Sequence, residues 1–183
     1  MNPVPLFLLA ISLPLLLGGC GEKEVNIEEL EEREDIRYLK GSDTPYTGKV
    51  FGLYENGQKR LQMNWVNGKP DGLWVGWHKN GQKSEEYTHK DGKEDGLSLF
   101  WHENGQKSEE TNYKDGERDG LRLMWHKNGQ KQIEANSKDG EPHGPALQWH
   151  DNGQKLSEGN FKNGKPDGLL VNWYQNGQKQ GET

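Results

Sequence analysis

The tetrapeptide NGQK recurs along this chain at a constant interval of 24 residues. A second pair of glycines keeps the same interval. A fixed interval of this length indicates a repeat architecture, in which each unit is stabilised by packing on its neighbours. We therefore predict about six tandem β-hairpin repeats, with Asp43 to Gly48 (DTPYTG) as a degenerate first copy. The tetrapeptide begins at Asn56, Asn80, Asn104, Asn128, Asn152 and Asn176, and the second glycine pair lies in segments that begin at Asn67, Asp91, Asp115, Asp139 and Asn163.

Each unit contains two short runs in which apolar residues alternate with other residues. In the segment GLWVGWH, which begins at Gly72, Leu73, Val75 and Trp77 fall on one face of a strand. Trp74 falls on the opposite face, because successive side chains of a strand point to opposite sides. The predicted fold class is all-β, a single-layer antiparallel β-meander or solenoid of 24-residue hairpins.

Most apolar residues of both strands have odd numbers, and this restricts the length of the loop that joins the two strands of each hairpin. A three-residue loop such as Lys79-Asn80-Gly81 places Tyr87 on the face of Leu73 and Trp77, which we expect the curling sheet to cover in part. This loop is a type I turn followed by a glycine bulge, with the glycine in the left-handed conformation. We therefore predict positive φ at the turn glycines Gly57, Gly81, Gly105, Gly129, Gly153 and Gly177.

Composition and charge divide the rest of the chain. Only 30% of the residues are hydrophobic, which suits a thin repeat fold better than a thick core. Between Glu22 and Arg37 eight acidic residues face three basic ones, a net charge of −5. We expect an acidic, solvated tether over 20–35 and the repeat domain over 36–183, with a short strand near Ile36 to Leu39. No basic cluster supports a nucleic-acid partner.

The N-terminus resembles a lipoprotein signal peptide. Residues 1–19 carry no charged side chain, and the apolar stretch from Val4 to Leu17 is too short to span a bilayer comfortably as a helix. The sequence LGGC that ends at Cys20, the only cysteine, resembles the lipobox of bacterial lipoproteins. The resemblance implies cleavage before Cys20, lipidation of that cysteine (palmitate among the acyl groups) and a membrane anchor in the bacterial cell envelope. Gly21, where an Asp would favour the inner membrane, favours the outer membrane if the organism is Gram-negative.

Three columns of equivalent polar residues, each 24 residues apart, could suggest chemistry. The column of His78 cannot share a metal, because equivalent residues lie about 10 Å apart. The column of Glu86 is expected to be a solvated strand face, and the column of Asp71 is expected to bind its own corner turn. The pattern indicates no catalytic set, no metal site, no cofactor and no enzyme. The columns are His78, His102, His126 and His150; Glu86, Glu110, Glu134 and Glu158; and Asp71, Asp95, Asp119 and Asp167.

The tryptophans are the candidate contact aromatics. A column of equivalent tryptophans belongs to the apolar stripe of the forward strands and is more typical of a core than of a ligand platform. Trp74, on the other face beside Gly76, is the better contact candidate. The column consists of Trp77, Trp101, Trp125, Trp149 and Trp173.

The pattern W-[HY]-x-N-G-Q-K followed by the second glycine pair resembles the MORN repeat in its bacterial variant form. The resemblance covers residues 46–183. It implies a groove-like β-solenoid that serves as a binding or scaffolding surface, and bacterial relatives are named antitoxin components of the YwqK type. The leading functional hypothesis is a lipid-anchored envelope protein that binds another protein. The alternatives are a glycan- or cell-wall-binding module and an antitoxin-like component of a toxin–antitoxin pair.

Overall fold

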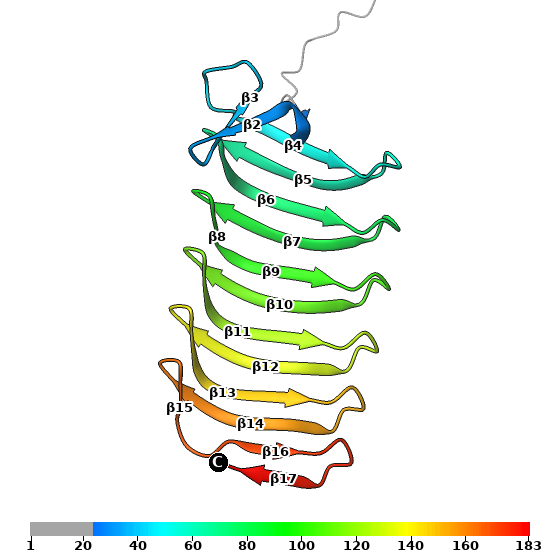
Figure 1. Cartoon of the computed structure of the whole chain (residues 1–183), viewed down its shortest axis with the longest axis vertical. Coiled ribbons are helices and arrows are strands. Elements are labelled where there is room, and N and C mark those ends of the chain that lie inside the picture. The colour runs from blue at the N-terminus through cyan, green and yellow to red at the C-terminus, as the bar shows by residue number, and fades with distance from the viewer. Residues whose placement is uncertain (1–23) are drawn as a thin grey trace, which may run out of the picture.

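A computed structural model describes residues 24–183, most of which form one long, almost entirely antiparallel β-sheet (Figure 1). Six consecutive hairpins follow one another along the long axis, with the NGQK turns at one margin and the corner turns at the other (Figure 1). The predicted fold is confirmed. The hairpins are β4 (Gly48–Leu53) with β5 (Lys59–Val66), β6 (Lys69–Trp77) with β7 (Lys83–Lys90), β9 (Gly96–Trp101) with β10 (Lys107–Lys114), β11 (Glu117–Trp125) with β12 (Lys131–Lys138), β13 (Glu141–Trp149) with β14 (Lys155–Lys162), and β16 (Val171–Trp173) with β17 (Lys179–Glu182).

The chain turns at every NGQK segment as the glycine pattern predicts. In the second hairpin the Gly81 amide donates to the carbonyl of His78, and the His78 amide donates to the carbonyl of Gln82. This closes a three-residue loop, Lys79 to Gly81. The six predicted glycines have φ between 80° and 83°, so the predicted left-handed conformation is confirmed.

The predicted face of the return strand is wrong, because each hairpin contains a second bulge. Trp77 pairs with Lys83, but Gly76 already pairs with Glu85, so Ser84 is the extra residue on the return strand. The bulge shifts the register by one, which exchanges the two faces of the return strand. Tyr87 therefore lies opposite Trp74, not on the face of Trp77. The equivalent bulged residues are Arg60, Ser108, Gln132, Leu156 and Gln180.

The corner turns are tight two-residue turns. Both Asp91 and Gly92 have positive φ, as a primed hairpin turn requires. Each corner also bonds to the hairpin before it, since the Gly92 amide donates to the carbonyl of Pro70. Gly68 donates in the same way to Tyr46, so the DTPYTG segment accepts the bond that later corner segments accept, although Asp43 and Thr44 lack the positive φ of a corner turn. Two short strands, β8 (Lys93–Glu94) and β15 (Lys165–Pro166), continue such corners.

The N-terminal segment covers the first hairpin. Strand β1 (Glu24–Asn26) pairs in parallel with β4, the 3-10 helix η1 (Ile27–Glu29) follows, and β2 (Leu30–Arg33) pairs with β3 (Ile36–Leu39) in a second sheet. Val25, Leu30 and Tyr46 pack on one face of the first hairpin and form the main buried core with residues of β4 and β5. The core residues from these strands are Val50, Leu61, Met63 and Trp65.

The acidic segment is therefore not a tether from Glu24 onward, because its few apolar residues are buried while its carboxylates stay at the surface. The predicted strand near Ile36 is confirmed as β3. The predicted signal peptide over 1–19 and the lipidated Cys20 lie outside the described residues. Within residues 24–183, no helix has the length and apolar character needed to cross a bilayer.

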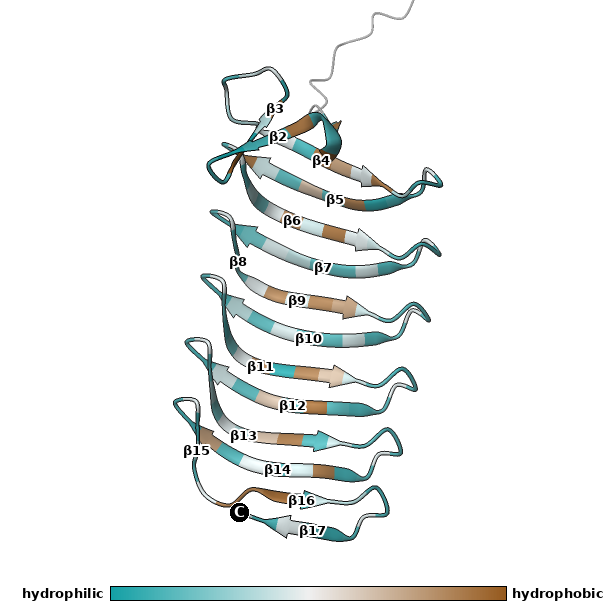
Figure 2. Cartoon of the chain, in the orientation of Figure 1, coloured by the Kyte–Doolittle hydropathy of each residue, from teal (hydrophilic) through white to brown (hydrophobic). Residues whose placement is uncertain are grey.

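The sheet has two faces, which we name by the covering segment. The inner face is the one on which Val25 and Leu30 pack, and it carries Trp74 and Tyr87. The outer face carries Leu73, Val75 and Trp77. The Leu/Trp stripe was expected to be the partly covered side, but it lies on the uncovered outer face. Figure 2 shows hydrophobic residues concentrated in the forward strands, such as β9 and β16, and polar residues at the turns.

Candidate functional site: the two faces of the sheet

The asparagine of each NGQK segment connects one hairpin to the next. Asn80 Oδ1 accepts a hydrogen bond from the Gln82 amide within its own turn, at 3.0 Å. Its Nδ2 donates to the carbonyl of Glu103 in the following turn, at 2.7 Å. The glutamine lies against the next turn, since a Cβ on Gly153 would stand 2.8 Å from Gln130 Oε1. The same inter-turn bond recurs from Asn104, Asn128 and Asn152, to Lys127, Asp151 and Gln175.

The histidine column has the same structural role. His78 Nε2 lies 2.7 Å from the carbonyl oxygen of Trp101, one hairpin along the array. In the first hairpin Tyr54 replaces the histidine, and its hydroxyl donates to the carbonyl of Trp77 at 2.6 Å. The column therefore holds neighbouring hairpins together. The other three histidines, His102, His126 and His150, lie 2.9 to 3.1 Å from the carbonyl oxygens of Trp125, Trp149 and Trp173.

On the outer face, lysine, tryptophan and glutamate form one repeated contact. Lys83 Nζ lies over the ring of Trp101, 5.4 Å from its centre, and 2.5 Å from Glu86 Oε2. The equivalent contacts hold Trp77, Trp125, Trp149 and Trp173 at 5.2 to 5.7 Å from a lysine of the preceding hairpin. The glutamate column thus pairs with lysines, as suits a polar strand face. Its members Glu110, Glu134 and Glu158 lie 2.6 to 2.7 Å from their lysines.

The aspartates of the corners also act between hairpins. Asp71 Oδ2 accepts from the Asp91 amide at 3.2 Å, and Asp95 Oδ2 accepts from the Asp115 amide at 3.4 Å. The prediction that these two carboxylates bind their own corner is wrong, because each reaches the next corner 20 residues away. Sequence reasoning missed these bonds, since nothing in one repeat fixes which backbone its side chains reach in the next.

The inner face differs between hairpins, whereas the outer face repeats. Tryptophan, lysine and glutamate recur at their outer positions in hairpins two to six. At the inner positions a different residue stands at almost every equivalent place. The positions equivalent to Trp74 hold Ser98, Arg122, Ala146 and Leu170, and those equivalent to Tyr87 hold Thr111, Ala135, Gly159 and Thr183.

An aromatic row begins where the N-terminal cover ends. Trp74 stacks on Tyr87 with ring centres 5.5 Å apart and an angle of 11° between the planes. Tyr87 in turn lies 6.1 Å from Phe100 at 29°, and His89 meets Tyr87 edge-on. The Trp74 indole donates to Glu85 Oε1 at 2.9 Å. Trp74, the preferred contact candidate, therefore already uses its Nε1 and one ring face within the chain.

Burial shifts the pKa of three side chains in and beside this row. Burial raises the pKa of Tyr87, and nearby Glu85 and Glu94 raise it further. Burial lowers the pKa of His89, against an opposing effect of Asp71. Burial also raises the pKa of Glu94, although a hydrogen bond from Ser98 opposes the shift. The row therefore favours the neutral forms of these three side chains.

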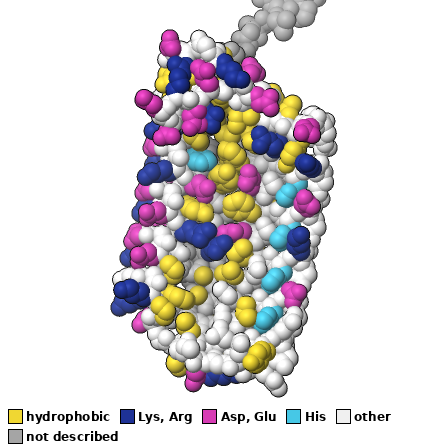
Figure 3. Space-filling model, viewed as in Figure 1, with side chains coloured by type: hydrophobic (Ala, Val, Ile, Leu, Met, Phe, Trp, Pro, Cys, Tyr) yellow, Lys and Arg dark blue, Asp and Glu magenta, His cyan; other side chains and the backbone are white. Residues whose placement is uncertain are grey.

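An ion pair interrupts the inner face at its middle. Arg122 Nε lies 2.8 Å from Glu109 Oε1, and their side chains are only 24% and 18% exposed. Figure 3 shows this face, with yellow side chains extending from the N-terminal end and charged ones between them halfway along. Beyond the pair the inner face carries Met124, Ile133 and Ala135, and then the polar Gln148 and the aromatic Phe161.

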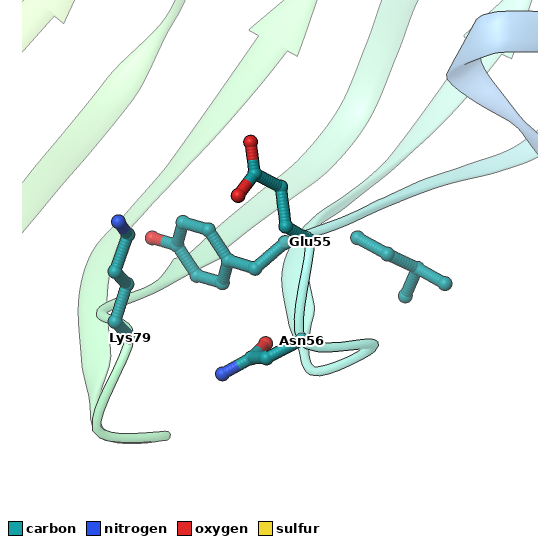
Figure 4. Close-up of a pocket in the computed structure, with 5 residues that line it drawn as sticks. Glu55, Asn56 and Lys79 are labelled. Atoms are coloured by element: carbon teal, nitrogen blue, oxygen red, sulfur yellow. The ribbon is translucent and has the colours of Figure 1, made fainter.

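The hollows on the surface are shallow. One of about 170 Å³ lies on the inner face near the last hairpin, between Phe161 and Leu170. Another, of about 330 Å³, lies at the first NGQK turn, where Glu55 and Asn56 face Lys79 of the next turn (Figure 4). Lys79 Nζ stands over the ring of Tyr54 at 5.9 Å. Among residues 24–183, no three His, Cys, Asp or Glu side chains are arranged to hold a metal ion.

The site residues that sequence reasoning missed are those of the inner face, such as Tyr87, Phe100 and the pair of Glu109 and Arg122. The second bulge hid them, because it exchanges the faces of every return strand. A usable signal was present, since the positions equivalent to Trp74 and to Tyr87 vary between repeats while the column of Glu86 recurs. Sorting positions by their variation would have placed Trp74 and Tyr87 together.

Comparison with known proteins agrees with the fold. Four segments match the family model described as MORN repeat variant, at residues 70–91, 94–115, 118–139 and 142–163. No curated protein matches the chain.

Two solved structures are similar to part of the chain. One is a TarM mutant of S. aureus in complex with fondaparinux, alpha-GlcNAc-glycerol and UDP, with a TM-score of 0.33 and 10% identity over 52% of this chain and 19% of that chain. A second crystal structure of TarM has a TM-score of 0.33 and 11% identity, over 53% and 19%. The chain spans about a fifth of these proteins, and a likeness of this degree carries no conclusion about function. The hairpins and the matched segments together define the chain as an all-β repeat protein, four segments of which match the MORN repeat variant.

Proposed function

We propose that this protein is a lipid-anchored scaffold of the bacterial cell envelope that binds a protein partner through the inner face of hairpins two to six. The observation that carries the proposal is the variation of the inner positions between hairpins whose outer positions recur. A surface that repeats at each hairpin offers the same contacts in several registers. A surface that differs at each hairpin fits a partner in one register only, which is what specific recognition needs.

The inner face also has the chemistry of a protein interface. It combines aromatic and aliphatic residues with a few charged ones, and its middle carries a partly buried Arg122. Aromatic residues and arginine are enriched at the centres of protein interfaces. The N-terminal cover ends at the first hairpin, so the positions from Phe100 onward are free of it.

A glycan-binding function is less well supported by the same residues. A sugar that packs on an aromatic side chain needs an open ring face. In the aromatic row Tyr87 lies between Trp74 and Phe100, so both of its faces have neighbours. In the outer column each tryptophan has a lysine ammonium over its ring.

Site-specific photo-crosslinking in the native envelope tests the inner face. A photoreactive residue at Met124, on the inner face, is expected to crosslink one discrete partner protein. The same residue at the neighbouring Leu123, on the outer face, should not give that product. Equal crosslinking of the same partner from both positions would contradict the proposal. Retention on a polysaccharide array that requires Tyr87 would favour the glycan alternative instead.

The lipid anchor is tested separately. The proposal rests on the resemblance of the LGGC sequence at Cys20 to a lipobox. Cells grown with an alkyne-bearing palmitate analogue should label the protein, and Cys20→Ala should abolish the label and release the protein from the membrane fraction. Unchanged labelling of the variant would refute lipidation at this position.

A further inference from the structure

The outer face carries a row of exposed leucines that the binding proposal does not use. Leu73, Leu97 and Leu121 are 47%, 44% and 38% exposed, and Leu169 is 64% exposed. Val75 and Trp77 follow Leu73 along the same face of β6, and their equivalents do so in the later hairpins. The outer face therefore alternates apolar forward strands with return strands that carry the lysine and glutamate columns, and exposed apolar residues repeated over this length mark an interaction site.

The outer row has a constant period. Equivalent residues recur at every second strand, which is a spacing of about 9.6 Å. A partner that matches such a surface along five hairpins must carry apolar groups at the same spacing. The outer face of a second copy of this chain has that spacing by construction. Its lysines and glutamates are already paired within each chain, so two such faces meet without net repulsion.

The area of the row is sufficient for a stable pair. Hairpins two to six extend about 45 Å, and the positions from leucine to tryptophan span about 17 Å with their side chains. This corresponds to on the order of 800 Å² per partner, the size of a standard specific interface. The apolar forward strands supply about half of that area and the polar return strands between them the rest, close to the polar share of known interfaces. Two sheets packed face to face lie about 10 Å apart, which leucine and tryptophan side chains fill.

We infer that the outer faces of two copies of this chain pack against each other to form a two-layer sandwich. The pairing buries the leucine and tryptophan columns and leaves both inner faces directed outward. The dimer then presents two copies of the varied inner surface. The inference rests on the outer residues alone and holds whether or not the inner face binds a protein.

The mass of the full chain in solution tests the pairing. With Cys20→Ser, so that no lipid is attached, the chain should have close to twice its 20.9 kDa mass by light scattering at micromolar concentration. Leu97→Lys with Leu121→Lys should lower the mass to that of one chain. The matched variant Ser137→Lys with Gln148→Lys, on the inner face, should remain dimeric. Circular dichroism of each variant establishes that the sheet is intact.

Disulfide formation between engineered cysteines tests which face of the sheet lies in the dimer interface, and it needs no variant that disrupts the dimer. Leu123 lies at the middle of the outer row, so a two-fold axis in the interface places it opposite its own copy whichever way the long axes run. Leu123→Cys in the Cys20→Ser chain should form a disulfide-linked dimer on oxidation, whereas Ala135→Cys on the inner face should not. A monomer at all concentrations, or equal crosslinking from both cysteines, would overturn the inference and leave the row to a partner of other chemistry.

Discussion

The two faces of the sheet are built from the same strands, but the side-chain contacts of the outer face recur at each hairpin whereas those of the inner face do not. On the outer face each lysine reaches the tryptophan of the next hairpin, as Lys107 reaches Trp125. Each middle hairpin supplies a tryptophan to the lysine before it and a lysine to the tryptophan after it. Both residues therefore recur in every such hairpin. Inner contacts also join neighbouring hairpins, as Arg122 of β11 pairs with Glu109 of β10, but the residues that make them differ from one hairpin to the next. The repeat period therefore belongs to the outer face and the turns, whereas variation is tolerated on the inner face.

The largest expected difference is between neighbouring residues on the two faces. Trp125→Ala removes an outer ring together with its contact to Lys107, and should lower the free energy of unfolding by about 2–3 kcal/mol. Met124→Ala, one residue away on the inner face, should cost about 1 kcal/mol, because Met124 is half-buried and has no lysine contact like that of Trp125. Urea denaturation of both variants gives the comparison. An equal loss from both would show that the faces do not differ in this way.

Glycines at a repeated and a varied position should respond differently to substitution. Gly129 has φ of +83°, so Gly129→Ala should destabilise the protein by about 1–2 kcal/mol. Gly181 stands at a varied inner position, where an added Cβ meets open space and φ is not in the left-handed region. Gly181→Ala should change the stability by less than about 0.5 kcal/mol. Thermal unfolding measures both, and a costly Gly181→Ala would contradict the assignment.

A comparison of two turn asparagines measures the contribution of one hydrogen bond between hairpins to stability. Asn128 binds its own turn and donates to Asp151 of the next turn, at 2.6 Å. Asn176 makes the same bond within its turn, but its Nδ2 donates to Gln178. Asn128→Ala should therefore cost about 1 kcal/mol more than Asn176→Ala, which is the contribution of one hydrogen bond. Equal losses in chemical denaturation would mean that the bond between turns contributes nothing.

The smallest expected effect is a pH dependence of the inner aromatic row. Burial lowers the pKa of His89 below its ordinary value of 6.5, so the unfolded chain binds a proton more readily than the folded one. The free energy of unfolding should therefore fall as the pH drops from about 7.5 to about 5.5. His89→Gln should make this decrease smaller. The same slope in the variant, measured by denaturation at both pH values, would assign the loss to other groups.

The sequence by itself determined the period, the hairpins and the turns. The NGQK and corner motifs specify local backbone conformations, and a glycine such as Gly81 takes positive φ for reasons contained in its own turn. Local chemistry of this kind is readable from one repeat.

Only the tertiary structure decided which residues share a face and what the acidic segment does. The extra residue at Ser84 is accommodated between two hydrogen-bonded strands, and the exchange of faces that follows moves Tyr87 beside Trp74. Val25 and Leu30 are buried because the first hairpin, which has no preceding repeat, offers apolar surface on its inner face. Both outcomes depend on contacts between strands, which are set by burial across the whole sheet rather than by the composition of any one segment.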